Sequence, residues 1–136
     1  MIATLELLGA LQVERRLGQL AEGEARDGAW EVMAGMALQA SASVKRHASG
    51  RPGPNVITGD YRRSINSRRS GSGASVRWTI GTNKPQGPRL EYGFYGVDSL
   101  GRFYHQPAFP HFGPAADEIE PQLYAAVRAY LDRINL

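Results

Sequence analysis

The sequence predicts an α+β fold, in which a small antiparallel sheet built on a hairpin is packed by two helices. Three patterns lead to this prediction: an apolar stripe with helical spacing over residues 24–47, two-residue alternation over 75–81, and a second apolar stripe near the C-terminus. The length of 136 residues suits one domain. We expect that domain to consist of a strand and helices in 1–47, a hairpin and an aromatic loop in 57–113, and a C-terminal helix in 114–136.

The N-terminal part of the chain is predicted to hold one short element and two helices. Residues 2–8 alternate weakly between apolar and polar side chains, which favours a strand, although a first helical turn fits nearly as well. Apolar residues in 10–20 have the spacing of a short amphipathic helix. The stripe over 24–47 predicts a longer helix, with acidic side chains near its start and basic ones at its end, as the helix dipole favours.

A hairpin is predicted after the glycine- and proline-rich segment 48–59, which cannot continue the helix. The alternation over 75–81 indicates one strand, and 61–69 is expected to form the other, although its alternation is poor. The turn between them is assigned to 70–73. On a strand, an even spacing returns to the same face, so Arg62 would align with Arg68, and Arg63 with Arg69.

The last element is a helix with an apolar stripe that ends near Ile134. Pro121 lacks a backbone N–H and is disfavoured inside a helix. We therefore expect the helix to begin near Glu120, with Pro121 in its first turn. A start at Pro114 would require a kink.

Composition and motifs argue against several kinds of chemistry. The chain has no cysteine, which excludes disulfides, thiolate metal sites and cysteine nucleophiles. His47, His105 and His111 lack the spacing of metal ligands, and His111 is more plausibly a packed or interface histidine. The sequence contains no nucleophile elbow, P-loop or dinucleotide fingerprint. We expect a protein that is not an enzyme and has no cofactor or metal. No apolar run is long enough to span a membrane, so a soluble intracellular protein is expected.

The charge is unevenly distributed along the chain. The formal net charge is +3, but residues 1–44 and 114–136 are acidic, whereas 45–69 is strongly basic. Within the basic segment, Arg-Arg-Ser occurs twice, at 62–64 and 68–70. These arginines are expected either to be solvated or to contact the acidic helices of a neighbouring subunit, or alternatively to follow a phosphate backbone.

Aromatic residues are concentrated in a segment without regular periodicity. Seven of them lie within 21 residues: Tyr92, Phe94, Tyr95, Phe103, Tyr104, Phe109 and Phe112. A loop that is so long and so aromatic either caps the core or meets another subunit, and the sequence leaves both alternatives open.

Three short segments of the chain, ITGDYRRSI at 57–65, LEYG at 90–93 and QPAFPHFGPA at 106–115, form a recognisable series. In order and spacing they resemble a tail-component family of long-tailed double-stranded DNA bacteriophages. The first resembles that family's TG-x-L-R-x-S-I motif, and the second resembles its E-[FY]-G motif. The segment QPAFPHFGPA at 106–115 is similar to the closing QP…PA motif before the final helix. Asp60-Tyr61 departs from the family pattern, which often has a small residue and a leucine there, and 94–105 is an insertion.

The resemblance implies a structural role in the phage neck. Proteins of this family form rings, commonly sixfold, that join the head connector to the tail tube as tail-completion or tail-terminator proteins. The expected partners are other copies of this chain, neighbouring connector, terminator or tail-tube proteins, and genomic DNA that passes through the channel without sequence-specific binding. The expected location is the virion, after assembly in the host cytoplasm, and no membrane is involved. The alternative is a DNA-binding module that uses 45–69.

Interface roles follow from the resemblance and from the charge and aromatic patterns. Thr58, Gly59, Arg63 and Ser64 would shape the entry to the hairpin, and Glu91 would pair with an arginine of the basic hairpin, within one chain or across the ring. The candidate interface and motif residues are Thr58, Gly59, Arg62, Arg63, Ser64, Arg68, Arg69, Glu91, Tyr92, Gly93, Phe103, Tyr104, Pro107, Phe109, His111 and Phe112.

Overall fold

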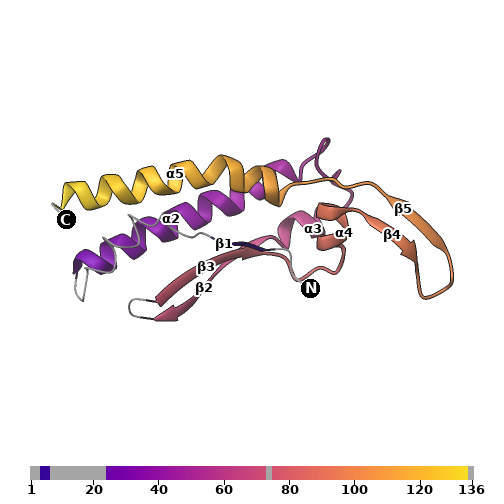
Figure 1. Cartoon of the computed structure of the whole chain (residues 1–136), viewed down its shortest axis with the longest axis horizontal. Coiled ribbons are helices and arrows are strands. Elements are labelled where there is room, and N and C mark those ends of the chain that lie inside the picture. The colour runs from indigo at the N-terminus through magenta and orange to yellow at the C-terminus, as the bar shows by residue number, and fades with distance from the viewer. Residues whose placement is uncertain (1–3, 7–23, 73–74, 135–136) are drawn as a thin grey trace.

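The computed structural model describes residues 4–6, 24–72 and 75–134, and it shows the predicted α+β architecture (Figure 1). Two long helices lie side by side over a small sheet, and a separate hairpin extends from one end. The elements are β1 (Thr4–Glu6), α2 (Glu24–His47), α3 (Asp60–Arg63), β2 (Asn66–Ser72), β3 (Ser75–Gly81), α4 (Gln86–Tyr92), β4 (Phe94–Val97), β5 (Phe103–Gln106) and α5 (Phe112–Arg133).

The two long helices α2 and α5 run antiparallel and form most of the core (Figure 1). The predicted stripe of α2 is buried, as Met33, Ala40 and Val44 show. In α5 the corresponding side chains are Ile119, Leu123, Val127, Tyr130 and Leu131. Both sequence periodicities therefore identified the faces that pack together.

The sheet is three-stranded and antiparallel, in the order β1-β3-β2. Its β3 strand matches the predicted strand 75–81, and β1 lies within the predicted strand 2–8. Ile80 of β3 is fully buried against the helices. The ladder between β2 and β3 continues to the pair Ser72↔Ser75, so residues 70–72, predicted to be in the turn, belong to β2.

The prediction of a strand over 61–69 was wrong in its first half. Residues 60–63 form the short helix α3, and the strand begins only at Asn66. Arg62 and Arg63 therefore lie in a helical turn and do not align with Arg68 and Arg69 on one strand. The physical reason is local: Asp60 and Arg63 form an ion pair across one turn, and the N–H groups of Arg63 and Ser64 bond to the carbonyls of Gly59 and Asp60.

The C-terminal helix begins at Phe112, eight residues before the predicted start. Pro121 lies inside α5 and not in its first turn. Pro121 and Asp117, whose carbonyl would bond to the N–H that proline lacks, are both exposed, so water can satisfy that carbonyl. The added turns bury Phe112 and Ala115.

Two further expectations concern a short helix near the N-terminus and the lack of a membrane-spanning segment. The predicted helix over 10–20 lies outside the described residues. Within the parts of the chain that the structure describes, no helix has the length and apolar character needed to cross a bilayer.

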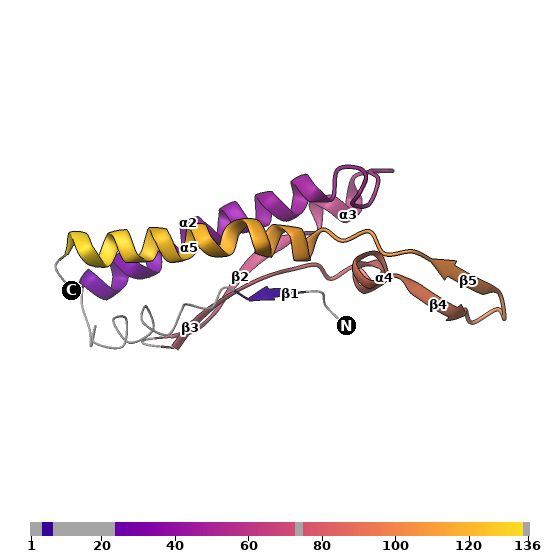
Figure 2. The same ribbon diagram turned by 45° about the horizontal axis from the view of Figure 1, so that its top comes forward.

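The segment rich in aromatic residues is a hairpin that we call the aromatic arm, residues 94–106. Strands β4 and β5 pair antiparallel, from Phe94↔Gln106 to Val97↔Phe103. Figures 1 and 2 both show the arm extending away from the helices and the three-stranded sheet. The arm itself therefore does not cap the core, whereas Phe112, at the end of the aromatic segment 92–112, is buried in the core, so each of the two alternatives that the sequence left open applies to a different part of the segment.

Candidate functional site: a pocket beside an aromatic arm

The buried carboxylate of Glu91 connects α4 to the start of α5. Its Oε2 accepts hydrogen bonds from the backbone N–H groups of His111 at 2.8 Å and Phe112 at 2.9 Å, and its Oε1 accepts one from Gly113 at 2.9 Å. These N–H groups have no partner within the helix, and the helix dipole favours a negative charge beside them. Glu91 thus caps α5, and the expected pairing with an arginine of the basic hairpin is not its role within the chain.

The imidazole of His111 lies between Glu91 and Tyr61. Its Nδ1 is 2.9 Å from the carbonyl oxygen of Phe109 and 3.1 Å from Oε2 of Glu91, both acceptors, so Nδ1 carries the proton. Nε2 of the neutral ring then accepts a hydrogen bond from the Tyr61 hydroxyl at 2.5 Å. His111 is fully buried, which agrees with the packed alternative for this residue.

Burial keeps this network in its neutral forms apart from the capping carboxylate. Desolvation lowers the pKa of His111 and outweighs the hydrogen bond to the Phe109 carbonyl and the charge of Glu91, which both act to raise it. Desolvation also raises the pKa of Tyr61, and the charge of Glu91 acts in the same direction. A protonated tyrosine that donates a hydrogen bond to a buried histidine is a structural anchor, and this arrangement ties α3 to the start of α5.

A second set of polar contacts holds α3 against the end of β3. The hydroxyl of Ser64 donates to the carbonyl oxygen of Tyr61 and lies 2.6 Å from the hydroxyl oxygen of Thr82. Gly59 precedes α3 with a φ of 84°, a conformation that glycine adopts without strain. Thr58 Oγ1 accepts a hydrogen bond from the N–H of Asp60 at 3.3 Å. Thr58, Gly59 and Ser64 therefore lie on the chain segment that leads into the β2–β3 hairpin, and their role in shaping its entry stays a prediction.

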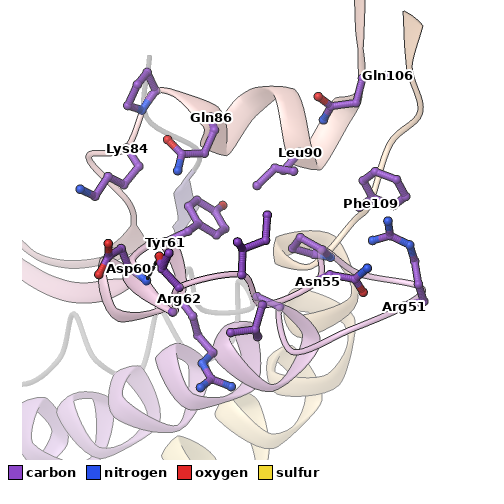
Figure 3. A pocket seen from close by; sticks show the side chains of 17 residues that line it. Arg51, Asn55, Asp60, Tyr61, Arg62, Lys84, Gln86, Leu90, Gln106 and Phe109 are labelled. Atoms are coloured by element: carbon purple, nitrogen blue, oxygen red, sulfur yellow. Dashed lines mark hydrogen bonds between the residues drawn. The ribbon is translucent and has the colours of Figure 1, made fainter.

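A pocket of about 880 Å³ opens beside this network, and we call it the α3–α4 pocket. Figure 3 shows Leu90 projecting from α4 across the pocket, with Lys84 at one end and Arg51 beside Phe109 at the other. Val56 and Ile57 contribute a further apolar surface, and the side chain of Ile57 is 93% exposed. The pocket therefore combines an apolar surface with basic side chains at its two ends, and Asp60 also lines it.

The base of the aromatic arm is joined to the pocket wall. The N–H of Phe109 donates to the carbonyl oxygen of Leu90 at 2.7 Å, and the Arg51 guanidinium stacks 3.8 Å from the centre of the Phe109 ring. Gly93 has a φ of 80°, and a Cβ there would lie 2.9 Å from the carbonyl oxygen of Gln106. Pro107 follows β5 and is exposed, as is Tyr92 at the end of α4.

One face of the arm is apolar and exposed. Successive residues of a strand point to opposite faces, so Tyr95 and Val97 share a face with Phe103 and His105 across the ladder. The rings of Tyr95 and Phe103 meet edge to face at 5.0 Å, and 73% and 62% of these residues are exposed. Tyr104 lies on the other face, near Arg102.

The tip of the arm is held by one carboxylate. Oδ1 of Asp98 accepts hydrogen bonds from the backbone N–H groups of Leu100 and Arg102, each at 2.9 Å, and Oδ2 accepts one from Arg102 Nε at 2.8 Å. Desolvation alone would raise the pKa of Asp98, but the hydrogen bonds from Arg102 and Leu100 together outweigh it and lower the pKa below its usual value. Leu100, 74% exposed, is thus displayed on an ordered turn.

The basic segment 45–69 is divided among several elements. Arg46 pairs with Glu118, Arg63 with Asp60, and Arg62 donates to Ser49 Oγ at 2.9 Å. Arg68 and Arg69 are exposed on β2, where Arg69 lies over the ring of Trp78. These arginines therefore do not form one continuous basic strip.

The chain matches no protein-family model, no curated protein and no solved structure. In the described parts of the chain, no group of three or more side chains is arranged to hold a metal ion.

The structure brings many of the candidate residues together, but not all. Thr58, Gly59, Arg62 and Phe109 line the pocket, Glu91 and His111 form the network behind it, and Phe112 is buried in the core. Phe103 and Tyr104 lie on the arm, whereas Arg68 and Arg69 lie apart on β2. Sequence reasoning did not select Tyr61, Ile57 or Leu90. The sequence did contain a signal for Ile57, because Val56 and Ile57 are adjacent apolar residues in the otherwise polar loop 48–59.

Proposed function

We propose that this protein is a structural component of the neck of a long-tailed bacteriophage, where copies of it form a ring that joins the head connector to the tail tube. Its place in the particle is that of a tail-completion or tail-terminator protein, and it acts through contacts with itself and its neighbours, without catalysis. Genomic DNA passes through the ring and is not bound at a specific sequence.

The observation that carries the proposal is the convergence of the three segments that resemble the phage family. They are separated in the sequence, yet Tyr61 of the first donates to His111 of the third, and Glu91 of the second caps the helix that the third begins. Segments that form one hydrogen-bonded unit are restrained together by the fold, which supports a shared architecture as the reason for the resemblance.

The exposed apolar face of the arm supports an assembly role. Large contiguous apolar surfaces on small proteins mark interaction sites, and aromatic residues are enriched in protein interfaces. In a heterologous arrangement each copy contributes two different surfaces, and the contacts close into a ring when the rotation between copies permits it.

The test is the state of the purified chain and its place in the particle. We expect annular particles by electron microscopy, with a mass that is a multiple of 14.9 kDa by light scattering, and we expect the protein in the neck of intact virions. A protein that stays monomeric and is absent from virions would contradict the proposal.

The DNA-binding alternative has less support, because Arg46 and Arg63 are neutralised by ion pairs and Arg51 stacks on Phe109. It predicts duplex affinity that falls by orders of magnitude between ~50 and ~200 mM salt. Absence of duplex binding at low salt would exclude it.

A further inference from the structure

We infer that the α3–α4 pocket receives the tip and the apolar face of the aromatic arm of a second copy of this chain. The inference rests on the self-assembly in the proposed function and adds to it the two surfaces that meet. Each copy would offer its arm to one neighbour and its pocket to another.

The two surfaces match in chemistry. Tyr95, Phe103 and Leu100 present rings and an aliphatic side chain, and the pocket presents the apolar surfaces of Ile57 and Leu90. Lys84 and Arg51 lie at the two ends of the pocket, and a cation over an aromatic face is attractive. The chain already uses this contact within itself, since Arg51 stacks on Phe109 at 3.8 Å and Arg89 on Phe94 at 4.0 Å.

The dimensions agree as well. The pocket volume of about 880 Å³ lies in the range of roughly 300 to 1,000 Å³ that is typical of pockets enclosing a drug-sized ligand. An aromatic side chain buries roughly 150 to 250 Å² when fully enclosed, and Tyr95 and Phe103 are 73% and 62% exposed. Enclosing both rings would therefore supply roughly 200 to 340 Å², about a quarter to two fifths of the roughly 800 Å² that each partner contributes to a standard stable interface, and Leu100 adds to this.

The geometry favours a second copy over the arm's own pocket. Gln106 and Phe109, at the base of the arm, line the pocket, while the tip points away from the body of the molecule (Figure 2). The hydrogen bonds of Asp98 order the tip before any contact is made, which reduces the entropy lost on binding. Because arm and pocket are different surfaces, the contact is heterologous and can repeat around a ring.

Cysteine cross-linking tests the contact directly, since the natural chain has no cysteine. Chains carrying Leu100→Cys are mixed with differently tagged chains carrying Ile57→Cys under mild oxidation. We expect this mixed disulfide to form at least tenfold faster than the one between chains carrying Leu100→Cys and chains carrying Leu38→Cys. Leu38 is a control position on α2, and 67% of it is exposed. Equal rates for the two pairs would overturn the inference.

Charge substitutions give a second test with matched controls. Leu100→Lys and Ile57→Lys should each abolish assembly, because each places a positive charge at the apolar contact beside the basic side chains of the pocket, while Leu38→Lys should assemble normally. A mixture of the two defective variants has one intact arm and one intact pocket, so we expect a 1:1 pair and no ring by native mass spectrometry. Normal assembly of either variant alone would overturn the inference.

The outcomes separate this inference from the proposed function. Rings that form without the specific cross-link would agree with the proposed neck ring and contradict the arm–pocket contact. The specific cross-link in protein that forms no ring and does not enter virions would support the contact and contradict the neck function. Absence of both would contradict both.

Discussion

Glu91 and His111 are bonded through two different groups of the histidine: the Glu91 Oε2 atom is 2.8 Å from the backbone nitrogen of His111 and 3.1 Å from its Nδ1. One carboxylate oxygen therefore both caps α5 and orients the ring that accepts the Tyr61 hydrogen bond. This relationship links α3, α4 and α5, and through them it positions the pocket relative to the arm.

The charge of Glu91 is expected to stabilise the fold. Glu91→Gln retains one acceptor oxygen but places an amide NH₂ against backbone N–H groups, so we expect a loss of about 1–3 kcal/mol in the free energy of unfolding. Urea denaturation measures it. The control Glu31→Gln, on an exposed position of α2, should change stability by no more than about 0.5 kcal/mol. Equal effects of the two substitutions would show that the cap is unimportant.

The Tyr61 hydroxyl is expected to matter because its acceptor is buried. Tyr61→Phe leaves His111 Nε2 without its partner and should cost about 1–3 kcal/mol. The exposed Tyr95 provides a matched control, since Tyr95→Phe preserves the ring contacts of the arm. Chemical denaturation of both variants measures the change in the free energy of unfolding. A Tyr61→Phe variant as stable as the wild type would refute the anchoring role.

A cluster at the α2–α5 contact is expected to make stability depend on pH in the acid range. Hydrogen bonds from His47 at 3.0 Å and Ser43 at 2.9 Å, together with Arg46, lower the pKa of Glu118 to about 2. The folded state therefore holds the carboxylate more strongly than the unfolded state does, and this stabilisation is complete above about pH 5 and lost as the pH falls toward 2.

Glu118→Gln should flatten the dependence of the unfolding free energy on pH between about 5 and 2. Solvent screening limits the size of the effect, because Glu118 remains partly exposed. Glu120→Gln, on the exposed side of the same helix, should retain the wild-type slope. Unfolding titrations at several pH values measure both, and identical slopes for wild type and Glu118→Gln would exclude the effect.

Three glycine substitutions separate backbone strain from steric contact. Gly93 and Gly101 have nearly equal φ angles of 80° and 78°, but only at Gly93 would a Cβ meet backbone atoms. We expect Gly101→Ala to cost about 1 kcal/mol and Gly93→Ala at least about 2 kcal/mol. Gly35→Ala, in an open position of α2, should stabilise the protein by about 0.5–1 kcal/mol. Thermal unfolding gives the ranking, and an equal cost at Gly93 and Gly101 would remove the steric argument.

Sequence by itself determined the elements whose side-chain periodicity matches one secondary structure. The stripe over 24–47 predicted α2 with its bounds, and the alternation of Val76, Trp78 and Ile80 predicted β3. These elements are specified locally, because each places its apolar residues on a single face.

Tertiary structure decided where the other elements begin and what they form together. Helix α5 starts at Phe112 because a carboxylate 21 residues earlier in the chain, that of Glu91, satisfies its first N–H groups. The aromatic segment became a hairpin through pairing between β4 and β5, and Tyr61 found its partner 50 residues away at His111. Such long-range contacts leave no periodic signal in the sequence, since their energy depends on residues that only folding brings together.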